Sequence, residues 1–471
     1  MKQFFLERRR LFCLLAPALF GLVYLFLCVT HLEQSVNLSE SQNVYMTRFG
    51  AFEAIKNAPQ STNLPFYYLI LKIIGRDIYS LRLLSAVLGA AAIFFIFKWT
   101  KYKYGAKAAI LGALFVSICP FMIHSGQSIQ ANILIILEAF ASLYFLQLAI
   151  DTKEKKWWVV YVIILSLGLW THLSFVLVWL VQLIYAASIY KKEFFDRKLF
   201  LLFVVPIFTF LPCLFMLNFS SVSETSLNTL METLTEMTLY SSTNETKALS
   251  LLLLLAGIVS LTYLFIKTKK KAVAPVLLIA MSISLLAVLS IIIPAISFSS
   301  ENLAVVPVST CLLIAISLAA QMNKRVKKNY QSRKNLRIII CGVIFVSISA
   351  LGIYNVFEKG SFDFESNSRP AVSLLYKNIE ALSYGKEAIV TSSEELYFEL
   401  SAYETSAHPV YLLGGNQIVN RIDDTKDMDD FWFVSMNEDA FPNDNLEVVE
   451  EATLNLDKYS PSYSLRKLSA K

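Results

Sequence analysis

The residues of this chain that could do chemistry are few, and they are scattered among long apolar runs. Glu138 is the only acid placed deep within such a run, in the sequence NILIILEAFASLYF. An ionisable group at that depth is a functional hypothesis, because burying a charge in a membrane is costly. The structural alternative is a protonated carboxyl, or one that is hydrogen-bonded to a neighbouring helix. No second acid or Lys shares its depth.

His172 is a second candidate, in the sequence LWTHLSF. The chain has four histidines, no H-E-x-x-H sequence and no paired cysteines, so residue spacing gives no support for a zinc site. A lone histidine at a helix end is as often a hydrogen-bonding residue as a catalytic one. The C-terminal region carries no catalytic motif, and Gly414 with Gly415 indicates an ordinary turn.

The elements that must position these residues are apolar runs of membrane-spanning length. A helix needs roughly 20 apolar residues to cross about 30 Å of hydrocarbon. Eleven runs meet or approach this, at 11–30, 80–97, 107–124, 130–150, 157–171, 173–190, 199–217, 249–266, 272–293, 302–321 and 338–356. The sequence therefore predicts a polytopic α-helical membrane protein, with the least certain boundary at Thr171 and His172.

Six clusters of Lys and Arg follow alternate apolar runs and predict the topology. They lie at 2–10, 98–107, 153–156, 191–198, 267–271 and 324–337. Short basic loops resist translocation, so these clusters are expected in the cytoplasm together with the N-terminus. Residues 357–471 then lie outside, where they carry 21 Asp and Glu against 10 Lys and Arg. Basic residues spread over helix ends, rather than forming one patch, argue against a nucleic-acid partner.

Two segments on the outer side are expected to fold. Residues 31–79, the first loop, carry apolar residues at helical spacing among charged ones, which predicts amphipathic helices in the interface. Residues 357–471 predict a small α/β domain after a membrane domain of residues 1–356. Its expected helices are 369–384 and 393–403, and its expected strands are 388–392, 409–413, 430–436 and 445–449.

Three classes of protein fit this organisation: a transporter, a membrane glycosyltransferase and a non-catalytic scaffold. Transporters commonly show repeated halves and midplane charges, and the sequence shows neither a repeated half nor a second midplane acid. All six cysteines lie in predicted spans and the C-terminal domain has none. This suits a bacterial or archaeal plasma membrane better than the endoplasmic reticulum.

An ordered series of short motifs between residues 63 and 132 separates these classes. The series reads NLPFYYLILKIIG, then SLRLLSAVLG, then ICPFMIHSGQSIQAN. It resembles the GT-C class of integral-membrane glycosyltransferases, in the protein O-mannosyltransferase-like and aminoarabinose-transferase-like branch. The matching positions are Pro65, Tyr67, Tyr68, Lys72, Gly75, Arg82, Ser85, Gly89, Pro120, Phe121 and Gln127, and His172 falls where that family has a His. The likeness covers roughly the first 190 residues.

The resemblance implies a reaction at the outer membrane face. A polyprenyl-phosphate-linked sugar is the donor, and a hydroxyl of a protein, lipid or glycan acceptor attacks its anomeric carbon. A carboxylate of the first loop removes the hydroxyl proton, and basic side chains hold the departing lipid phosphate. On this resemblance Glu40 is the expected base, and the expected substrate-binding residues are Arg82, Lys72, Tyr67, Tyr68, Gln127 and His172. Residue spacing gives no reason to expect a metal, and no cofactor is assigned beyond the polyprenyl-phosphate-linked sugar, which is the donor substrate.

The sequence departs from the family pattern at polar positions. Ser39 stands where an Asp is expected, Ser128 and Gln130 replace a Glu and an Arg, and Glu301 lies near an expected Arg. Two hypotheses follow. Either Glu40 has taken over as base, or the fold is kept without activity as a scaffold or partner subunit of a cell-envelope glycosylation complex.

Overall fold

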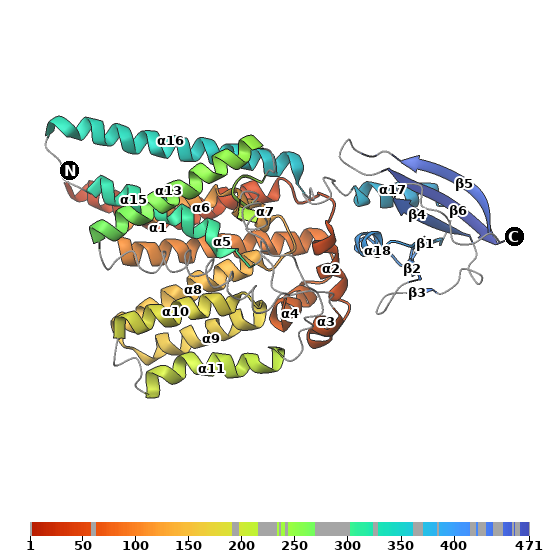
Figure 1. The fold of residues 1–471 in the computed structure, drawn as a ribbon, viewed down its shortest axis with the longest axis horizontal. Helices are drawn as coiled ribbons and strands as arrows, with labels where there is room; N and C mark the ends of the chain where they lie inside the picture. Colours follow the sequence, from red (N-terminus) through yellow and green to blue (C-terminus); the bar gives the residue numbers. More distant parts are fainter. Residues whose placement is uncertain are drawn as a thin grey trace.

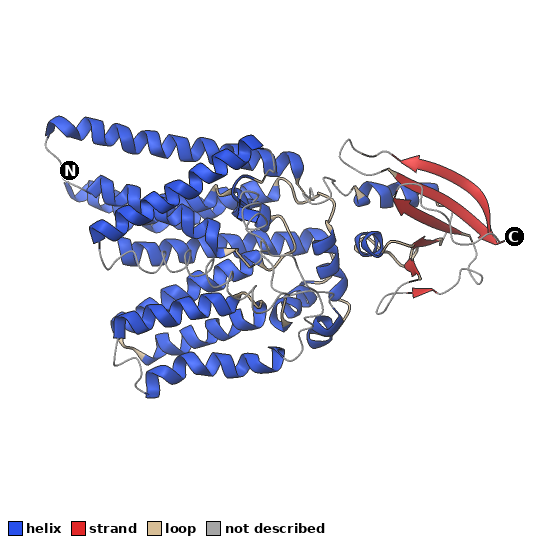
Figure 2. Cartoon of the chain, viewed as in Figure 1, coloured by secondary structure: helices blue, strands red, loops and turns tan. Residues whose placement is uncertain are grey.

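A computed structural model gives the structure of the chain. It describes residues 2–57, 63–190, 197–214, 233–234, 237–240, 244–268, 302–323, 328–360, 371–383, 386–414, 421–422, 430–436, 446–454, 456 and 462–470. A bundle of long helices forms one part of the molecule, and a small α/β domain lies beyond one end of that bundle (Figures 1 and 2). The N-terminus lies at the opposite end of the bundle (Figure 1).

The helices of the bundle follow the predicted apolar runs. They are α1 (Lys2–Val29), α5 (Ile78–Tyr104), α6 (Ala106–Ser117), α7 (Pro120–Gly126), α8 (Asn132–Thr152), α9 (Lys155–Thr171), α10 (Phe175–Tyr190), α11 (Arg197–Leu214), α13 (Asn244–Thr268), α15 (Val305–Asn323) and α16 (Lys328–Lys359). The predicted span 272–293 lies outside the described residues. The prediction of a helical membrane fold is confirmed.

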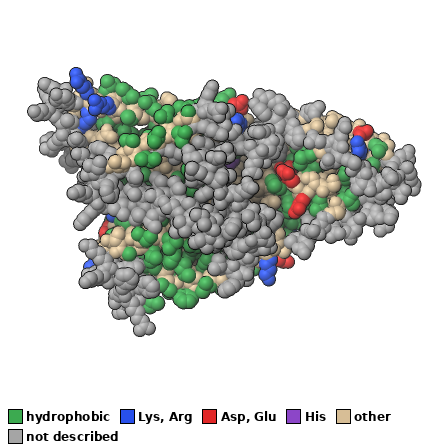
Figure 3. All heavy atoms as spheres, viewed as in Figure 1, with side chains coloured by type: hydrophobic (Ala, Val, Ile, Leu, Met, Phe, Trp, Pro, Cys, Tyr) green, Lys and Arg blue, Asp and Glu red, His purple; other side chains and the backbone are tan. Residues whose placement is uncertain are grey.

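Length and hydropathy allow four of the described helices to cross a membrane, or five if a bent pair counts as one span. The four are Ile78–Tyr104, Asn132–Thr152, Val305–Asn323 and Gln331–Lys359. The number of crossings, predicted as eleven, therefore stays a prediction. Apolar side chains are prominent among the described residues on the flank of the bundle in Figure 3, while Lys and Arg gather where α16 begins. Such an apolar flank suits lipid contact.

The third predicted span is bent, which the sequence analysis did not anticipate. α6 and α7 meet at an angle of 58°. Pro120 occupies the first turn of α7, and the preceding Cys119 is extended, with φ −71° and ψ 122°. A proline ring disfavours helical geometry in the residue before it, so the helix stops and restarts in a new direction.

The first loop is helical, as predicted, and it folds into three short helices. They are α2 (Leu38–Met46), α3 (Ala51–Asn57) and α4 (Pro65–Ile74). Asn37 caps α2 by accepting the backbone N–H of Glu40, and the Glu40 side chain accepts the backbone N–H of Asn37 in return. α4 begins at Pro65 and ends at Gly75, whose φ of +108° favours glycine.

The C-terminal domain is a six-stranded mixed sheet with two helices. Its elements are α17 (Val372–Leu382), β1 (Ala388–Thr391), α18 (Glu394–Ser401), β2 (Val410–Leu413), β3 (Arg421–Ile422), β4 (Phe431–Met436), β5 (Leu446–Leu454) and β6 (Tyr463–Ala470). The strand order is β3-β2-β1-β4-β6-β5, parallel from β3 to β4 and antiparallel from β4 to β5. The predicted α/β character and its four strands are confirmed, and β3 and β6 are additional. The predicted domain boundary at residue 356 stays a prediction.

Candidate functional site

The two charged residues at the centre of the predicted site, Glu40 and Arg82, contact each other directly. Arg82 Nη2 donates to Glu40 Oε2 at 2.8 Å, and Arg82 Nε donates to Glu40 Oε1 at 3.1 Å. Both side chains are only 2% exposed. The pair is thus bidentate, which is the geometry in which guanidinium and carboxylate bind most strongly.

The remaining donors of Arg82 hold the start of the first loop. Nη1 donates to the backbone oxygens of Leu32 at 2.8 Å and Gln34 at 2.5 Å, and Nη2 donates to the backbone oxygen of Ser35 at 3.2 Å. A guanidinium has five N–H groups, and these contacts together with the two to Glu40 use all of them. Arg82 therefore fixes the chain after α1 against α5.

The hydrogen-bond acceptor sites of the Glu40 carboxylate are also all occupied. Besides Arg82, Oε1 accepts the backbone N–H of Ile129 at 2.8 Å, and Oε2 accepts that of Asn37 at 3.3 Å. Glu40 thereby connects α2, α5 and the loop between α7 and α8. It can reach the proton of an acceptor hydroxyl only if one of these four bonds opens. Its role as base stays a prediction.

A chain of amides connects this pair to His172. Asn43 Nδ2 donates to Ile129 O at 2.9 Å, and Asn63 Nδ2 donates to Asn43 Oδ1 at 3.0 Å. Asn63 in turn forms an antiparallel bridge with His172 at the end of α9. The His172 ring is buried, and its Nδ1 accepts the backbone N–H of Ser174 at 3.1 Å. His172 thus anchors the end of the first loop to the bundle.

The other predicted substrate-binding residues have structural contacts of their own. Gln127 Nε2 donates to Leu27 O at 3.2 Å and Cys28 O at 3.3 Å, which satisfies carbonyls at the C-terminal end of α1. Lys72 is exposed, and its Nζ donates to Phe49 O at 2.7 Å. Tyr67 and Tyr68 are buried, with ring centroids 5.9 Å apart. Substrate binding by these residues remains a prediction.

Two of the positions that depart from the family pattern lie next to each other. Gln130 Nε2 lies 3.5 Å from Ser39 Oγ, and Gln130 Oε1 accepts Asn132 Nδ2 at 3.0 Å. Ser128 Oγ donates to Ser125 O. Neutral hydrogen bonds therefore stand where the resemblance leads one to expect an acid and an arginine. Glu301 lies outside the described residues.

Glu138 is hydrogen-bonded to a neighbouring helix, which is the structural alternative given for it in the sequence analysis. Thr171 Oγ1, at the end of the neighbouring helix α9, donates to Glu138 Oε1 at 2.9 Å. Within the described ranges Oε2 is buried and has no hydrogen-bond partner. In the same ranges no group of three or more His, Cys, Asp or Glu side chains is placed to hold a metal ion.

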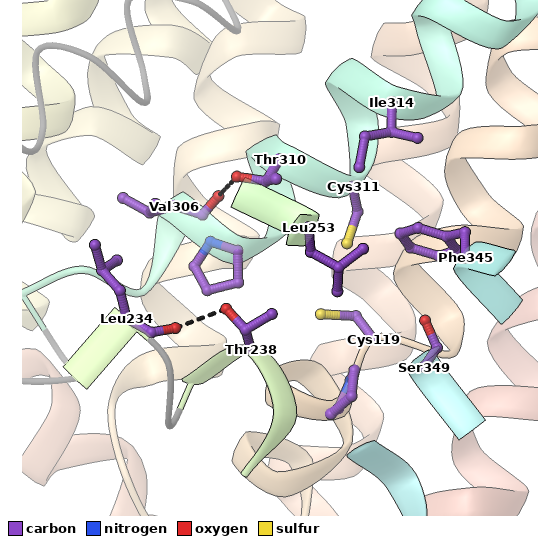
Figure 4. Close-up of a pocket in the computed structure, with 12 residues that line it drawn as sticks. Cys119, Leu234, Thr238, Leu253, Val306, Thr310, Cys311, Ile314, Phe345 and Ser349 are labelled. Atoms are coloured by element: carbon purple, nitrogen blue, oxygen red, sulfur yellow. Dashed lines mark hydrogen bonds between the residues drawn. The ribbon is translucent and has the colours of Figure 1, made fainter. Parts of the chain in front are cut away.

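An apolar cavity lies beside the bend between α6 and α7 (Figure 4). Cys119 and Pro120 line it from the bend, and the rest of its lining comes from α13, α15 and α16 together with Leu234 and Thr238. Thr310 Oγ1 donates to Val306 O and Thr238 Oγ1 to Leu234 O, so both hydroxyls are satisfied within their own segments. The cavity is suited to an apolar group.

The sequence analysis missed the contacts between the first loop and the C-terminal domain. Val36 N donates to Tyr403 Oη at 3.0 Å, and Ser35 Oγ lies 2.7 Å from Ser373 Oγ. The segment that Arg82 holds is therefore also the segment on which the C-terminal domain docks. Each of these contacts joins residues more than 300 positions apart in the chain, so only the structure could identify them.

Comparisons with known proteins concern the family and the fold. The model of the family described as dolichyl-phosphate-mannose-protein mannosyltransferase matches residues 66–216. No curated protein sequence matches the chain significantly. The structure of ArnT from Cupriavidus metallidurans bound to undecaprenyl phosphate is similar over 96% of this chain and 97% of that chain, with a TM-score of 0.59 and 13% identity.

A second similarity is to the oligosaccharyltransferase AglB from Archaeoglobus fulgidus, solved with an inhibitory peptide and a dolichol-phosphate. Its TM-score is 0.53 and its identity 11%, over 85% of this chain and 64% of that chain. This chain thus spans under two thirds of the length of AglB. The resemblance to GT-C glycosyltransferases is confirmed, and the fold is GT-C-like.

Proposed function

We propose that the protein is a membrane glycosyltransferase that uses a polyprenyl-phosphate-linked sugar. The observation that carries this proposal is the similarity in fold, over 96% of this chain, to a protein solved with undecaprenyl phosphate. The family match over residues 66–216 supports it independently, because those residues include Arg82, Gln127 and His172. The acceptor in this proposal is a hydroxyl of a protein, lipid or glycan.

The reaction in this proposal takes place on the outer face of the membrane. Arg82 near the start of α5 and Ile129 just before α8 both contact the first loop, so the basic ends of α5 and α8 point away from it. The N-terminus lies at the end of the bundle that faces away from the C-terminal domain (Figure 1). The positive-inside rule supports placing the C-terminal domain outside.

The chemistry assigned to Glu40 is proton removal. The acceptor oxygen attacks the anomeric carbon, the bond from that carbon to the phosphate oxygen breaks, and the hydroxyl proton passes to Glu40. The acceptor hydroxyl can reach Glu40 only after the hydrogen bond from Ile129 N or from Asn37 N to this carboxylate breaks. The ion pair with Arg82 keeps the carboxylate in position meanwhile.

Turnover by the purified full chain tests this proposal. Labelled polyprenyl-phosphate hexoses and pentoses are offered as donors to wild type, Glu40→Gln and the control Glu33→Gln, which alters an exposed carboxylate of the same loop. Transfer by Glu40→Gln should fall about 10² to 10⁴-fold, the usual effect of losing a general base. Thermal melting of each variant separates lost chemistry from lost folding. Wild-type turnover in folded Glu40→Gln would remove Glu40 from the reaction.

A second candidate function is that of a catalytically inactive scaffold or partner subunit, and a specific observation favours it. All acceptor sites of Glu40 and all donors of Arg82 are occupied, and Ser39 and Gln130 form a neutral contact beside them. On this reading wild type shows no transfer from any donor, although it is folded. Transfer by wild type that Glu40→Gln abolishes would exclude it.

A further inference from the structure

Two arginines of the first loop meet one carboxylate of the C-terminal domain. Arg48 forms an ion pair with Glu404, and Arg76 Nη2 lies 4.0 Å from the same carboxylate oxygen. Both guanidiniums also donate to Ser401 O at the end of α18, at 3.2 Å from Arg48 and 3.5 Å from Arg76. A helix C-terminus carries a partial negative charge of about one half. Positive charge therefore remains in excess at this junction.

Arg76 has donors to spare. Its side chain is 44% exposed, and both of its contacts use Nη2. Within the part of the chain that the structure describes, its Nε and Nη1 have no hydrogen-bond partner. The Glu404 carboxylate cannot compensate further, because its other oxygen accepts the backbone N–H of Val410 at 3.1 Å.

The charge balance at Arg76 favours an added anion. Partial burial, and after it the neighbouring Arg48 guanidinium, lower the pKa of Arg76, while Glu404 opposes that change. The two cations therefore repel each other more than one carboxylate offsets. A negative group placed against Arg76 would relieve this repulsion and would form charge-assisted hydrogen bonds.

The surface of α4, the helix before Arg76, exposes apolar side chains together with Lys72. On α4, Leu69 is 45% exposed, Ile73 73% and Ile74 40%. α4 ends at Gly75, whose φ of +108° turns the chain directly before Arg76. A helix with an exposed apolar face lies at the membrane boundary, and a basic side chain at its edge is then at head-group level. A ligand that is apolar along one part and anionic at its head fits both features.

We propose that Arg76, with Arg48, binds the phosphate group of an anionic membrane lipid at the junction between the first loop and the C-terminal domain. The lipid chains lie along the exposed face of α4. Bound there, the phosphate contacts the same guanidiniums as Glu404, so the phosphate and this carboxylate compete for them. The inference depends on the membrane setting of the chain and not on the transferase reaction.

Lipid binding to the purified full chain tests this inference. Native mass spectrometry in detergent measures the affinity for phosphatidylglycerol and for a short-chain polyprenyl phosphate, with phosphatidylcholine and inorganic phosphate as comparison probes. Arg76→Ala should weaken binding of both anionic lipids about tenfold, the effect of losing a hydrogen bond to a charged group. Lys56→Ala, which removes an exposed cation of α3 in the same loop, should leave affinity unchanged.

Glu404→Gln provides a change of opposite sign. It removes the negative charge that competes for both arginines but keeps an oxygen for Val410 N, so affinity for anionic lipid should rise. Because Arg76 is 44% exposed, Arg76→Ala should fold, and Arg76→Lys should retain part of the affinity.

Three results would overturn the inference. One is equal affinity of wild type and Arg76→Ala for both anionic lipids. Another is equal binding of phosphatidylcholine and phosphatidylglycerol, since charge would then not matter. The third is binding of inorganic phosphate as tight as that of the lipids and equally dependent on Arg76, which would assign a soluble phosphate in place of a lipid. Loss of transfer activity with normal lipid binding would count against the proposed function alone.

Discussion

The molecule contains two contacts between arginine and glutamate. They differ in burial and in how many of their hydrogen-bonding groups are in use. Arg82 and Glu40 are each 2% exposed, and all their donors and acceptors are used within the bundle and the first loop. Arg76 is 44% exposed, shares Glu404 with Arg48, and keeps donors without partners in the described residues. The first contact is complete without a ligand, whereas the second has capacity for one.

The difference indicates what each contact does. A filled, buried pair determines where its neighbours lie, here α2, α5 and the loop before α8. A partly exposed cluster with excess charge contributes little to stability but can attract an anion. On the proposal made above, the position of the first loop depends on Arg82, and binding of a lipid phosphate depends on Arg76.

The largest expected effect comes from removing one partner of the buried pair. Arg82→Met leaves the Glu40 charge buried without its counter-ion, which typically costs about 3 to 5 kcal/mol. Reversible unfolding in detergent measures the loss. The double variant Glu40→Gln/Arg82→Met should recover part of it, because the two residues are in contact. Arg76→Met is the matched control and should change stability by less than about 1 kcal/mol. An equal loss in both arginine variants would contradict the distinction.

A smaller effect is expected from the amide chain that continues from the buried pair. Asn43→Ala removes the donor to Ile129 O and the acceptor of Asn63 Nδ2, and buried groups left without partners cost about 1 to 3 kcal/mol. Hydrogen exchange should rise selectively in the loop before α8. Asn378→Ala, which loses an exposed bond to Leu374 O, should leave that loop unchanged. Unchanged exchange in Asn43→Ala would show that Ile129 is held by Glu40 alone.

The smallest expected effect concerns the docking of the C-terminal domain. Tyr403 Oη accepts Val36 N, and burial raises the pKa of Tyr403 above its ordinary value. The folded state thus keeps this proton to higher pH than the unfolded state. The contribution of Tyr403 to folding stability is fully present below the ordinary tyrosine pKa of about 10, and it falls as the pH rises above that value. Protease cleavage of the C-terminal domain should increase between about pH 9.5 and 11 in wild type. In Tyr403→Phe, the free energy of undocking the C-terminal domain should be about 1 kcal/mol lower at neutral pH, so cleavage is faster there. Its cleavage rate should also depend less on pH.

Much of the fold could be predicted because hydropathy is a local signal. The long helices, the three helices of the first loop and four strands of the C-terminal sheet all follow from periodicity and composition. β6 was missed because Arg466 and Lys467 interrupt its apolar alternation, although Lys467 is buried against Glu387. The bend before Pro120 was missed because the apolar run continues across it.

The site was predictable only in part, for a different reason. Family resemblance selected Glu40 and Arg82 as charged residues of interest but gave no indication that they pair with each other. Their other partners are backbone groups of Leu32, Gln34 and Ile129, and such groups are the same for every residue type. The cluster at Arg76 depends on Glu404, more than 300 positions away in the chain. Contacts of that range follow only from the folded structure.

Lipid affinity and melting temperature, measured side by side in Arg76→Lys and Arg82→Lys, test the central distinction most directly. An ammonium keeps the charge but cannot reproduce the five-donor geometry of a guanidinium. The account predicts that Arg76→Lys weakens binding of phosphatidylglycerol severalfold at an unchanged melting temperature. It predicts that Arg82→Lys lowers the melting temperature while its folded fraction binds the lipid like wild type. Weakened lipid binding in folded Arg82→Lys, with normal binding in Arg76→Lys, would contradict it.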